Sequence, residues 1–354
     1  MTNDLHAHAD LLVLDSHVDI PWPPGPSPFE DGPRCVDLPK LRQGGVAAVC
    51  FAAYIPQGRR DDAAHLSAAT RARAMLSAIA DMAPKDESGG MLTTSADAVE
   101  AAYNAGLPAI IPAIENGYAI GRDLGLLEEF ARRGIRYMTL THNGHNEIGD
   151  AAIPLPSLDD LDQEYNGLSD FGQSVISRMN DLGVLVDISH AAKSTMLQAA
   201  RRSRTPVVAT HSCMRALCDH KRNLDDEQLE VLAATGGVAQ ITIVSNFLRP
   251  KARAEDVSVE DIVDHIDYAV QRMGIDHVGI GTDFDGGGGV RDYMNAAQTP
   301  VLTAALARRG YGRAELEKIW GGNFLRLMRK AEEAAISCNH SPSDRNAALY
   351  HRPE

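Results

Sequence analysis

Imidazole and carboxylate side chains recur at the ends of short apolar segments along this chain. Such groups bind divalent metal ions and transfer protons, so a cluster of them could support hydrolytic chemistry. A single segment ending in histidine would be explained by a hydrogen-bonded core residue, but six of eight segments end in His, Asp or Glu. We therefore interpret these endings as parts of one site. They are His17, Asp19, Glu115, His142, His190, His211 and Asp283.

The apolar segments predict eight β-strands. Several are apolar nearly throughout, as expected for parallel strands that are buried on both faces. The predicted strands are residues 11–19, 46–54, 109–115, 136–142, 184–190, 207–211, 238–244 and 277–283. Helical patterns between and after them predict helices at residues 61–82, 124–133, 168–182, 194–202, 225–234, 258–273 and 314–333.

Strands that alternate with helices in this way predict an α/β fold, a (β/α)8 barrel of the TIM type. A barrel gathers the C-terminal ends of its strands on one rim, where the residues named above would converge. Residues 21–33 and 150–167 follow strand ends and are predicted to be active-site loops. We expect residues 1–337 to form a single barrel domain and residues 338–354 to form a polar C-terminal tail.

Five of the strand-end residues are candidate metal ligands. His17 and Asp19 are two positions apart, so on a strand their side chains face the same side. Five ligands that include one bridging carboxylate suit a centre of two divalent ions, and imidazole with carboxylate favours zinc. Two such ions can convert a shared water into hydroxide near neutral pH, which indicates hydrolysis. The candidates are His17, Asp19, Glu115, His190 and His211.

Composition excludes several classes of partner. The 354 residues carry 34 basic and 48 acidic side chains, a net charge of −14, which argues against nucleic acid and anionic membranes as partners. No run of about 18 apolar residues predicts a membrane span, and the first ten residues do not resemble a signal peptide. The five cysteines form no Cys-x-x-Cys pair, so we expect reduced thiols and a cytoplasmic location.

Several spaced motifs together resemble the renal (membrane) dipeptidase family of metallopeptidases, family M19. They are His-Val-Asp-Ile-Pro-Trp at 17–22, Arg-Tyr-Met-Thr-Leu-Thr-His at 136–142, residues 167–172, residues 179–190 ending in Leu-Gly-Val-Leu-Val-Asp-Ile-Ser-His, His-Ser at 211–212 followed by Arg-Asn at 222–223, residues 281–286, and Gly-Gly-Asn-Phe-Leu-Arg at 321–326. The resemblance runs in order from about Leu11 to Leu327, which is nearly the whole chain.

The resemblance implies a role for each metal-site residue. His17 and Asp19 would hold one zinc ion, His190 and His211 would hold the other, and Glu115 would bridge the two. Asp283 would be the general acid and base that handles the proton of the bridging hydroxide. His142 would stabilise the oxyanion of the tetrahedral intermediate.

The resemblance also implies a substrate and its contacts. The family hydrolyses dipeptides, often accepts a D-residue at the second position, and commonly forms homodimers. Arg222 would bind the free carboxylate of the dipeptide, and Phe247 and Trp22 are expected to contact the substrate. The sequence departs from the pattern at two places. Phe247 stands where some relatives have tyrosine, and the motif that begins at Glu115 reads Glu-Asn-Gly where many relatives have Glu-Gly.

Two other functions compete with this one. Another metal-dependent amidohydrolase, such as a deacylase or phosphotriesterase, would use the same scaffold, but a fixed Arg222 suits a substrate carboxylate. A non-catalytic binding protein would not need both sets of ligands together with Asp283.

Four further side chains are predicted to have no part in the chemistry. His8 is expected to be exposed, His265 to lie on the surface or at a helix end, and His145 to lie in a solvated loop. Asp187 would face away from His190 on a regular strand, and is expected to cap or pack against a helix.

Overall fold

The computed structural model describes residue 8, residues 10–84 and residues 89–339. Within these ranges, every helix is too short or too polar to cross a membrane. The predicted C-terminal tail, residues 338–354, lies outside the described residues except for its first two positions, which continue the last helix.

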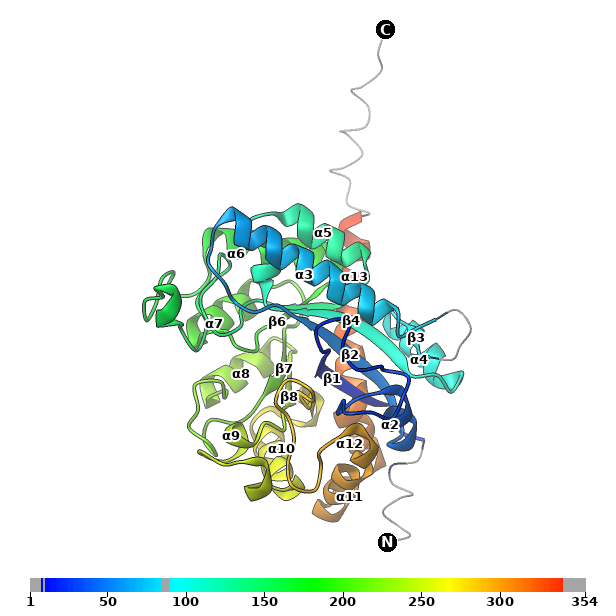
Figure 1. Ribbon diagram of the computed structural model, residues 1–354. Helices are drawn as coiled ribbons and strands as arrows, with labels where there is room; N and C mark the ends of the chain where they lie inside the picture. The colour runs from blue at the N-terminus through cyan, green and yellow to red at the C-terminus, as the bar shows by residue number, and fades with distance from the viewer. Residues whose placement is uncertain (1–7, 9, 85–88, 340–354) are drawn as a thin grey trace.

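Eight parallel strands form a nearly closed barrel, as predicted (Figure 1). Their order around the barrel is the order of the chain, and a short ninth strand, β3 (Met91–Leu92), pairs in parallel with the start of β4. The barrel strands are β1 (Val13–Asp19), β2 (Val46–Tyr54), β4 (Ala109–Glu115), β5 (Tyr137–Thr139), β6 (Leu185–Asp187), β7 (Val208–Ser212), β8 (Val238–Ile241) and β9 (Val278–Ile280).

The barrel closes between its first and last strands. Val18 of β1 pairs in parallel with Phe284, which follows β9. The amide of Asp19 donates to the carbonyl of Phe284 at 3.0 Å, and the amide of Asp283 donates to the carbonyl of His17 at 2.9 Å. These bonds join residues that are 265 and 266 positions apart in the chain, and they bring both segments to one rim.

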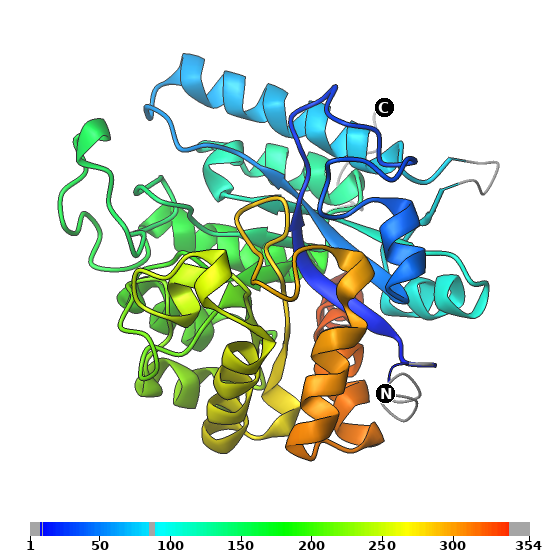
Figure 2. The ribbon, with the colours of Figure 1, turned by 60° about the horizontal axis from the view of Figure 1, so that its bottom comes forward.

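Helices surround the barrel (Figures 1 and 2). They are α2 (Leu38–Gln43), α3 (Asp62–Ala80), α4 (Ala96–Asn104), α5 (Leu124–Arg132), α6 (Asp170–Leu182), α7 (Lys193–Arg202), α8 (Asp226–Ala234), α9 (Ser245–Leu248), α10 (Val259–Met273), α11 (Pro300–Arg309), α12 (Arg313–Glu317) and α13 (Asn323–Asn339). One core layer joins strands to these helices. A second joins inward-facing strand residues such as Tyr137 and Leu185 to Phe324 and Met328 of α13.

Strands β2 and β4 have the predicted bounds, whereas β5, β6, β8 and β9 end three residues earlier than predicted. At these strand ends the backbone stops pairing with the neighbouring strands, and its side chains reach the rim. His190 and Asp283 adopt the left-handed region, with φ of 65° and 62°, which a strand cannot continue through.

Residues 314–333 are helical throughout, as predicted, but the helix is not regular. Helix α12 is followed by a π-helical turn, η6 (Lys318–Gly322), and then by α13. A β-carbon on Gly321 would lie 2.6 Å from the carbonyl oxygen of Leu12, so this turn fits against the start of β1 only with glycine.

Three histidines predicted to be solvated are buried instead. His8 bonds to the hydroxyl of Thr303 and the carbonyl of Gly44, and His265 accepts from the amide of Met214 and donates to the carbonyl of Leu248. His145 contacts the amide of Ala151 and the carbonyl of Leu161. Each ring therefore satisfies loop backbone groups, a role that sequence spacing does not reveal.

Candidate metal centre

The structure brings the seven predicted strand-end residues together at the C-terminal rim of the barrel. His17 and Asp19 lie on β1, Glu115 ends β4 and His211 lies on β7. His142, His190 and Asp283 follow β5, β6 and β9. A pocket of about 270 Å³ opens over this cluster. It is lined by Asp19, Tyr54, Glu115, His142, Asn143, His190, Val244, Phe247, Asp283 and Gly286.

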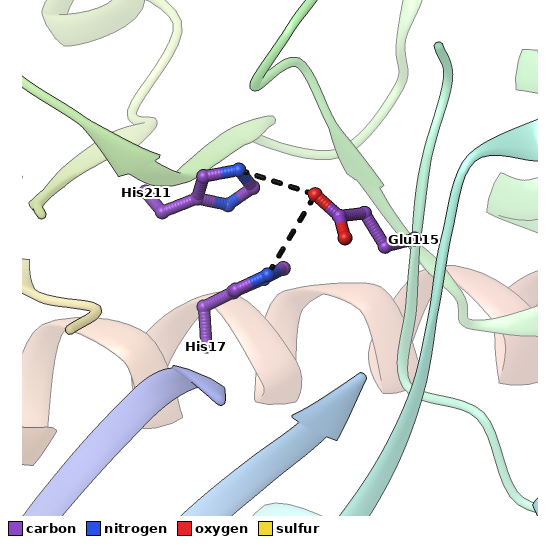
Figure 3. A group of neighbouring side chains, drawn as sticks. All are labelled: His17, Glu115 and His211. Atoms are coloured by element: carbon purple, nitrogen blue, oxygen red, sulfur yellow. Dashed lines mark ion pairs between the residues drawn. The ribbon is translucent and has the colours of Figure 1, made fainter. Parts of the chain in front are cut away.

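The carboxylate of Glu115 lies at the centre of the cluster. Its Oε1 atom is 3.1 Å from Nε2 of His190, 3.4 Å from Nε2 of His211, and 3.8 Å from Nε2 of both His17 and His142. Figure 3 shows His17 and His211 turned towards this oxygen. Two ligands that each lie about 2.1 Å from a tetrahedral zinc ion are about 3.4 Å apart, so these separations leave room for coordination.

The ligand atoms form two groups that share Glu115. One contains His17, Glu115 and His211, and the other contains Glu115, His142 and His190. The ring centroids of His17 and His211 are 3.8 Å apart, whereas those of His190 and His211 are 5.0 Å apart. This grouping differs from the predicted one, which paired His190 with His211. The assignment of ligands to individual ions therefore stays a prediction.

Polar atoms without partners indicate what the cluster is built to hold. Among the described residues, Nε2 of His17, Nε2 of His211 and Oδ1 of Asp19 are buried and have no hydrogen-bond partner. Leaving such atoms unpaired is costly, and coordination to a cation would use their lone pairs. The donor set of imidazole and carboxylate fits a divalent transition metal such as zinc.

A second layer of hydrogen bonds fixes which nitrogen of His211 is free. Asp187 is fully buried and accepts from the hydroxyls of Thr139 at 2.5 Å and Thr210 at 2.7 Å, and from the amides of Ser189 and Thr210. Because the Thr210 proton goes to Asp187, its oxygen accepts from Nδ1 of His211 at 2.9 Å. Nε2 of His211 then carries the lone pair that faces Glu115.

The helix-packing role predicted for Asp187 is thus wrong, because its carboxylate lies among strand ends. Tyr137 orients His17 on β1 in the way that Thr210 orients His211, because its hydroxyl lies 2.8 Å from Nδ1 of His17.

Burial and charge keep the histidines neutral. Desolvation, with a further contribution from the Arg222 guanidinium, lowers the pKa of His17 and His142 to about 3 and lowers the pKa of His190. The same desolvation, with neighbouring carboxylates, raises the pKa of Glu115 and Asp19 well above the usual range. Neutral imidazoles are the form that binds metal, and bound cations would relieve the repulsion between the carboxylates.

Asp283 and Arg222 flank the ligands. Burial raises the pKa of Asp283 to about 7, and its Oδ1 lies 4.0 Å from Nε2 of His17. Arg222 is 3% exposed, donates to the carbonyl of His211 at 3.2 Å, and has an unpaired Nε. Burial lowers the pKa of Arg222 to about 10, so the guanidinium stays charged at neutral pH. It faces the ring of Phe247 at 5.5 Å and lines an adjoining pocket of about 360 Å³.

One predicted substrate contact is not brought to the cluster. Trp22 is 50% exposed, lies against the guanidinium of Arg71 at 4.3 Å, and is not part of the lining of the metal pocket. Its role stays a prediction.

Two residues that line the pocket were not predicted from the sequence. The ring of Tyr54 lies 4.7 Å from that of His142, and Oδ1 of Asn143 lies 3.3 Å from Nδ1 of His190. Tyr54 ends the predicted second strand, but the search for His, Asp and Glu at strand ends did not include tyrosine.

Comparison with known proteins gives one consistent family. A family model described as "Membrane dipeptidase (Peptidase family M19)" matches residues 2–342. Dipeptidase verJ of Clonostachys rogersoniana is 30% identical over 93% of this chain and 86% of its own length. Dipeptidase 3 of Rattus norvegicus is 32% identical over 84% of this chain and 58% of its own length.

Solved structures agree with these sequence matches. The probable dipeptidase PvdM from Pseudomonas aeruginosa superposes with a TM-score of 0.90 at 28% identity, covering 94% of this chain and 98% of that one. A metallopeptidase from Rhodobacter sphaeroides, liganded with a phosphinate mimic of the dipeptide L-Ala-D-Ala, superposes with a TM-score of 0.79 at 26% identity. It covers 91% of this chain and 99% of that one.

The shared position of Glu115 predicts how metal content responds to substitution. Glu115→Gln should lower occupancy at both sites, because both ligand groups include this carboxylate. His190→Ala should lower occupancy at one site more than at the other. Elemental analysis of purified protein after dialysis against buffered zinc gives the total metal content, and anomalous peak heights from zinc-loaded crystals give the occupancy of each site. Glu333→Gln, a surface change at an ion pair with Lys330, is the control and should keep the wild-type metal content. Wild-type zinc content in Glu115→Gln would contradict the shared role.

Proposed function

The chain belongs to peptidase family M19, the membrane dipeptidases, and we propose that it cleaves dipeptides at a centre of two divalent ions, most simply zinc. It is a metal-dependent dipeptidase, and the proposal concerns the number and identity of the ions, the residue roles and the substrate. The main observation in support is that the buried carboxylate of Glu115 belongs to both ligand groups.

The ions, when bound, would lower the pKa of water and polarise the peptide carbonyl. The protein supplies the remaining chemistry. Asp283 lines the pocket, points a carboxylate oxygen at the cluster, and does not belong to either ligand group. We assign it the proton of the attacking water, which it then passes to the leaving amine. A carboxyl whose pKa burial raises towards neutrality is suited to accept and release a proton.

We assign His142 to the carbonyl oxygen of the substrate, although its ring also belongs to the second group of possible ligands. Its side chain is 18% exposed, whereas those of His17, His190 and His211 are 0%, 8% and 1% exposed. The three buried rings suit ligation, and the ring that reaches the pocket suits donation to the oxyanion that develops during attack. The lowered pKa of His142 leaves the ring neutral. A neutral ring can donate its N–H in a hydrogen bond and keep the proton.

Arg222 supports the choice of a substrate with a free carboxylate. A buried guanidinium with an unpaired Nε, beside a pocket that also contains His190, can hold a carboxylate next to the scissile bond. The relative from Rhodobacter sphaeroides binds a mimic of L-Ala-D-Ala, which supports a D-residue at the second position of the substrate here.

A cytoplasmic location and a homodimer remain predictions. The location is supported by Cys35, Cys50, Cys213 and Cys218, which are free thiols.

Removing the Arg222 charge should abolish discrimination between acid and amide. Wild-type protein should cleave Ala-Ala much faster than its C-terminal amide, because losing a buried charge partner costs roughly 2–5 kcal/mol. Arg222→Met should bring the two values of kcat/KM close together. Arg215→Met is the matched control, because Arg215 lines the same adjoining pocket but already pairs with Asp219. Equal cleavage of acid and amide by wild-type protein would refute this role.

Removing the Asp283 carboxylate should stop proton transfer without unfolding the site. Asp283→Asn should lower kcat by about 10²–10⁴-fold, the usual contribution of one general acid or base, and should keep metal and melting temperature. Asp285→Asn is the control, because that carboxylate accepts from the amides of Cys35 and Val36 and is absent from the pocket lining. Near-normal kcat in Asp283→Asn excludes the role, and loss of metal makes Asp283 a ligand.

A further inference from the structure

Arg34 is a buried cation that the chemistry above does not use. It lies in the loop between β1 and α2 and is 5% exposed. Its Nε and Nη2 atoms are buried and, among the described residues, have no hydrogen-bond partner. Burying a guanidinium without partners costs several kcal/mol, so a protein retains one where something pairs with it.

The neighbouring acidic groups do not supply that partner. Burial lowers the pKa of Arg34, and the nearby negative charges of Asp285 and Asp37 act in the opposite direction. Asp285 already accepts from the amides of Cys35 at 2.8 Å and Val36 at 3.1 Å. Asp37 accepts from the amides of Lys40 and Gly32 and pairs with the Lys40 ammonium group. The ion pairs found within the described part of the chain do not include Arg34.

Arg34 instead lines a mainly apolar pocket of about 250 Å³. The pocket lies between the proline-rich loop after β1 and the last turn of α3. The other lining residues are Ile20, Pro21, Pro23, Pro24, Gly25, Pro26, Pro28, Phe29, Ala78, Asp81 and Met82. Asp81 is the one acidic group among them and is solvent-exposed, so water screens its charge.

We propose that this pocket binds a small organic carboxylate, with its carboxylate on the Arg34 guanidinium and a compact apolar body against the prolines and Phe29. A guanidinium pairs with a carboxylate through charge-assisted hydrogen bonds. The apolar lining favours an organic anion over inorganic phosphate, which would lose hydration without gaining further partners. The volume is below the roughly 300–1,000 Å³ of pockets for drug-sized molecules, so the ligand is small.

This pocket is separate from the metal centre. The two pockets have no lining residue in common, although Asp19 of one is followed directly by Ile20 of the other. Binding in this pocket is therefore independent of the proposed catalytic roles, and a test must show that the carboxylate binds here and not at the metals.

The test measures binding of isovalerate by saturation-transfer NMR titration, with isovaleramide as the neutral match. Wild-type protein and Glu115→Gln, whose metal site is impaired, should bind isovalerate alike. Arg34→Met removes the charge and Ala78→Phe fills the pocket while keeping Arg34. Each should weaken binding at least tenfold. Arg201→Met, an exposed arginine on α7, is the charge-matched control and should bind as wild type does.

The outcomes separate the pocket from its alternatives. Saturable binding of isovalerate that is lost in both pocket variants, with no saturable binding of the amide, supports the site. Unchanged binding in Ala78→Phe, equal binding of the amide, loss of binding in Glu115→Gln alone, or no saturable binding to wild-type protein would overturn it. Because Ala78→Phe retains Arg34, the test holds even if Arg34→Met unfolds.

Discussion

One buried carboxylate constrains the whole rim of this barrel. Glu115 ends a fully apolar strand, is 3% exposed, and has four imidazole rings within 3.8 Å of one of its oxygens. All four rings are held neutral by burial, so they cannot balance its charge. A carboxylate in such surroundings is stable as an anion only beside cations. The atoms around it are imidazole nitrogens, which are typical metal ligands.

The barrel supplies the rigidity that this arrangement needs. Asp15 of β1 accepts from the amide and hydroxyl of Thr282, which follows β9, and from the amide of His17. It thereby joins the strand that presents His17 to the segment that presents Asp283. At β6 and β7, Asp187 accepts from Thr210, and Thr210 orients His211. Both carboxylates are buried between strand ends, where a displacement of either would move a metal-site residue.

Much of this site could be predicted from the sequence, because a barrel converts strand order into a ring of strand ends. Identifying apolar strands was enough to bring His17, Glu115, His190 and His211 together. The supporting layer could not be predicted, because Asp187, Thr210 and Tyr137 are defined by contacts between strands and not by spacing along one. The pairing of histidines around Glu115 also depends on where β5 and β6 leave the ladder. The break at Gly321 depends on the approach of β1, which local helical periodicity does not contain.

The central claim is that Glu115 is shared by two metal ions. Anomalous X-ray diffraction at the zinc absorption edge, from crystals of zinc-loaded protein, tests it most directly. We expect two peaks per chain, each within about 2.0–2.2 Å of one carboxylate oxygen of Glu115 and of imidazole nitrogens. A single peak, or two peaks of which only one contacts Glu115, would contradict it.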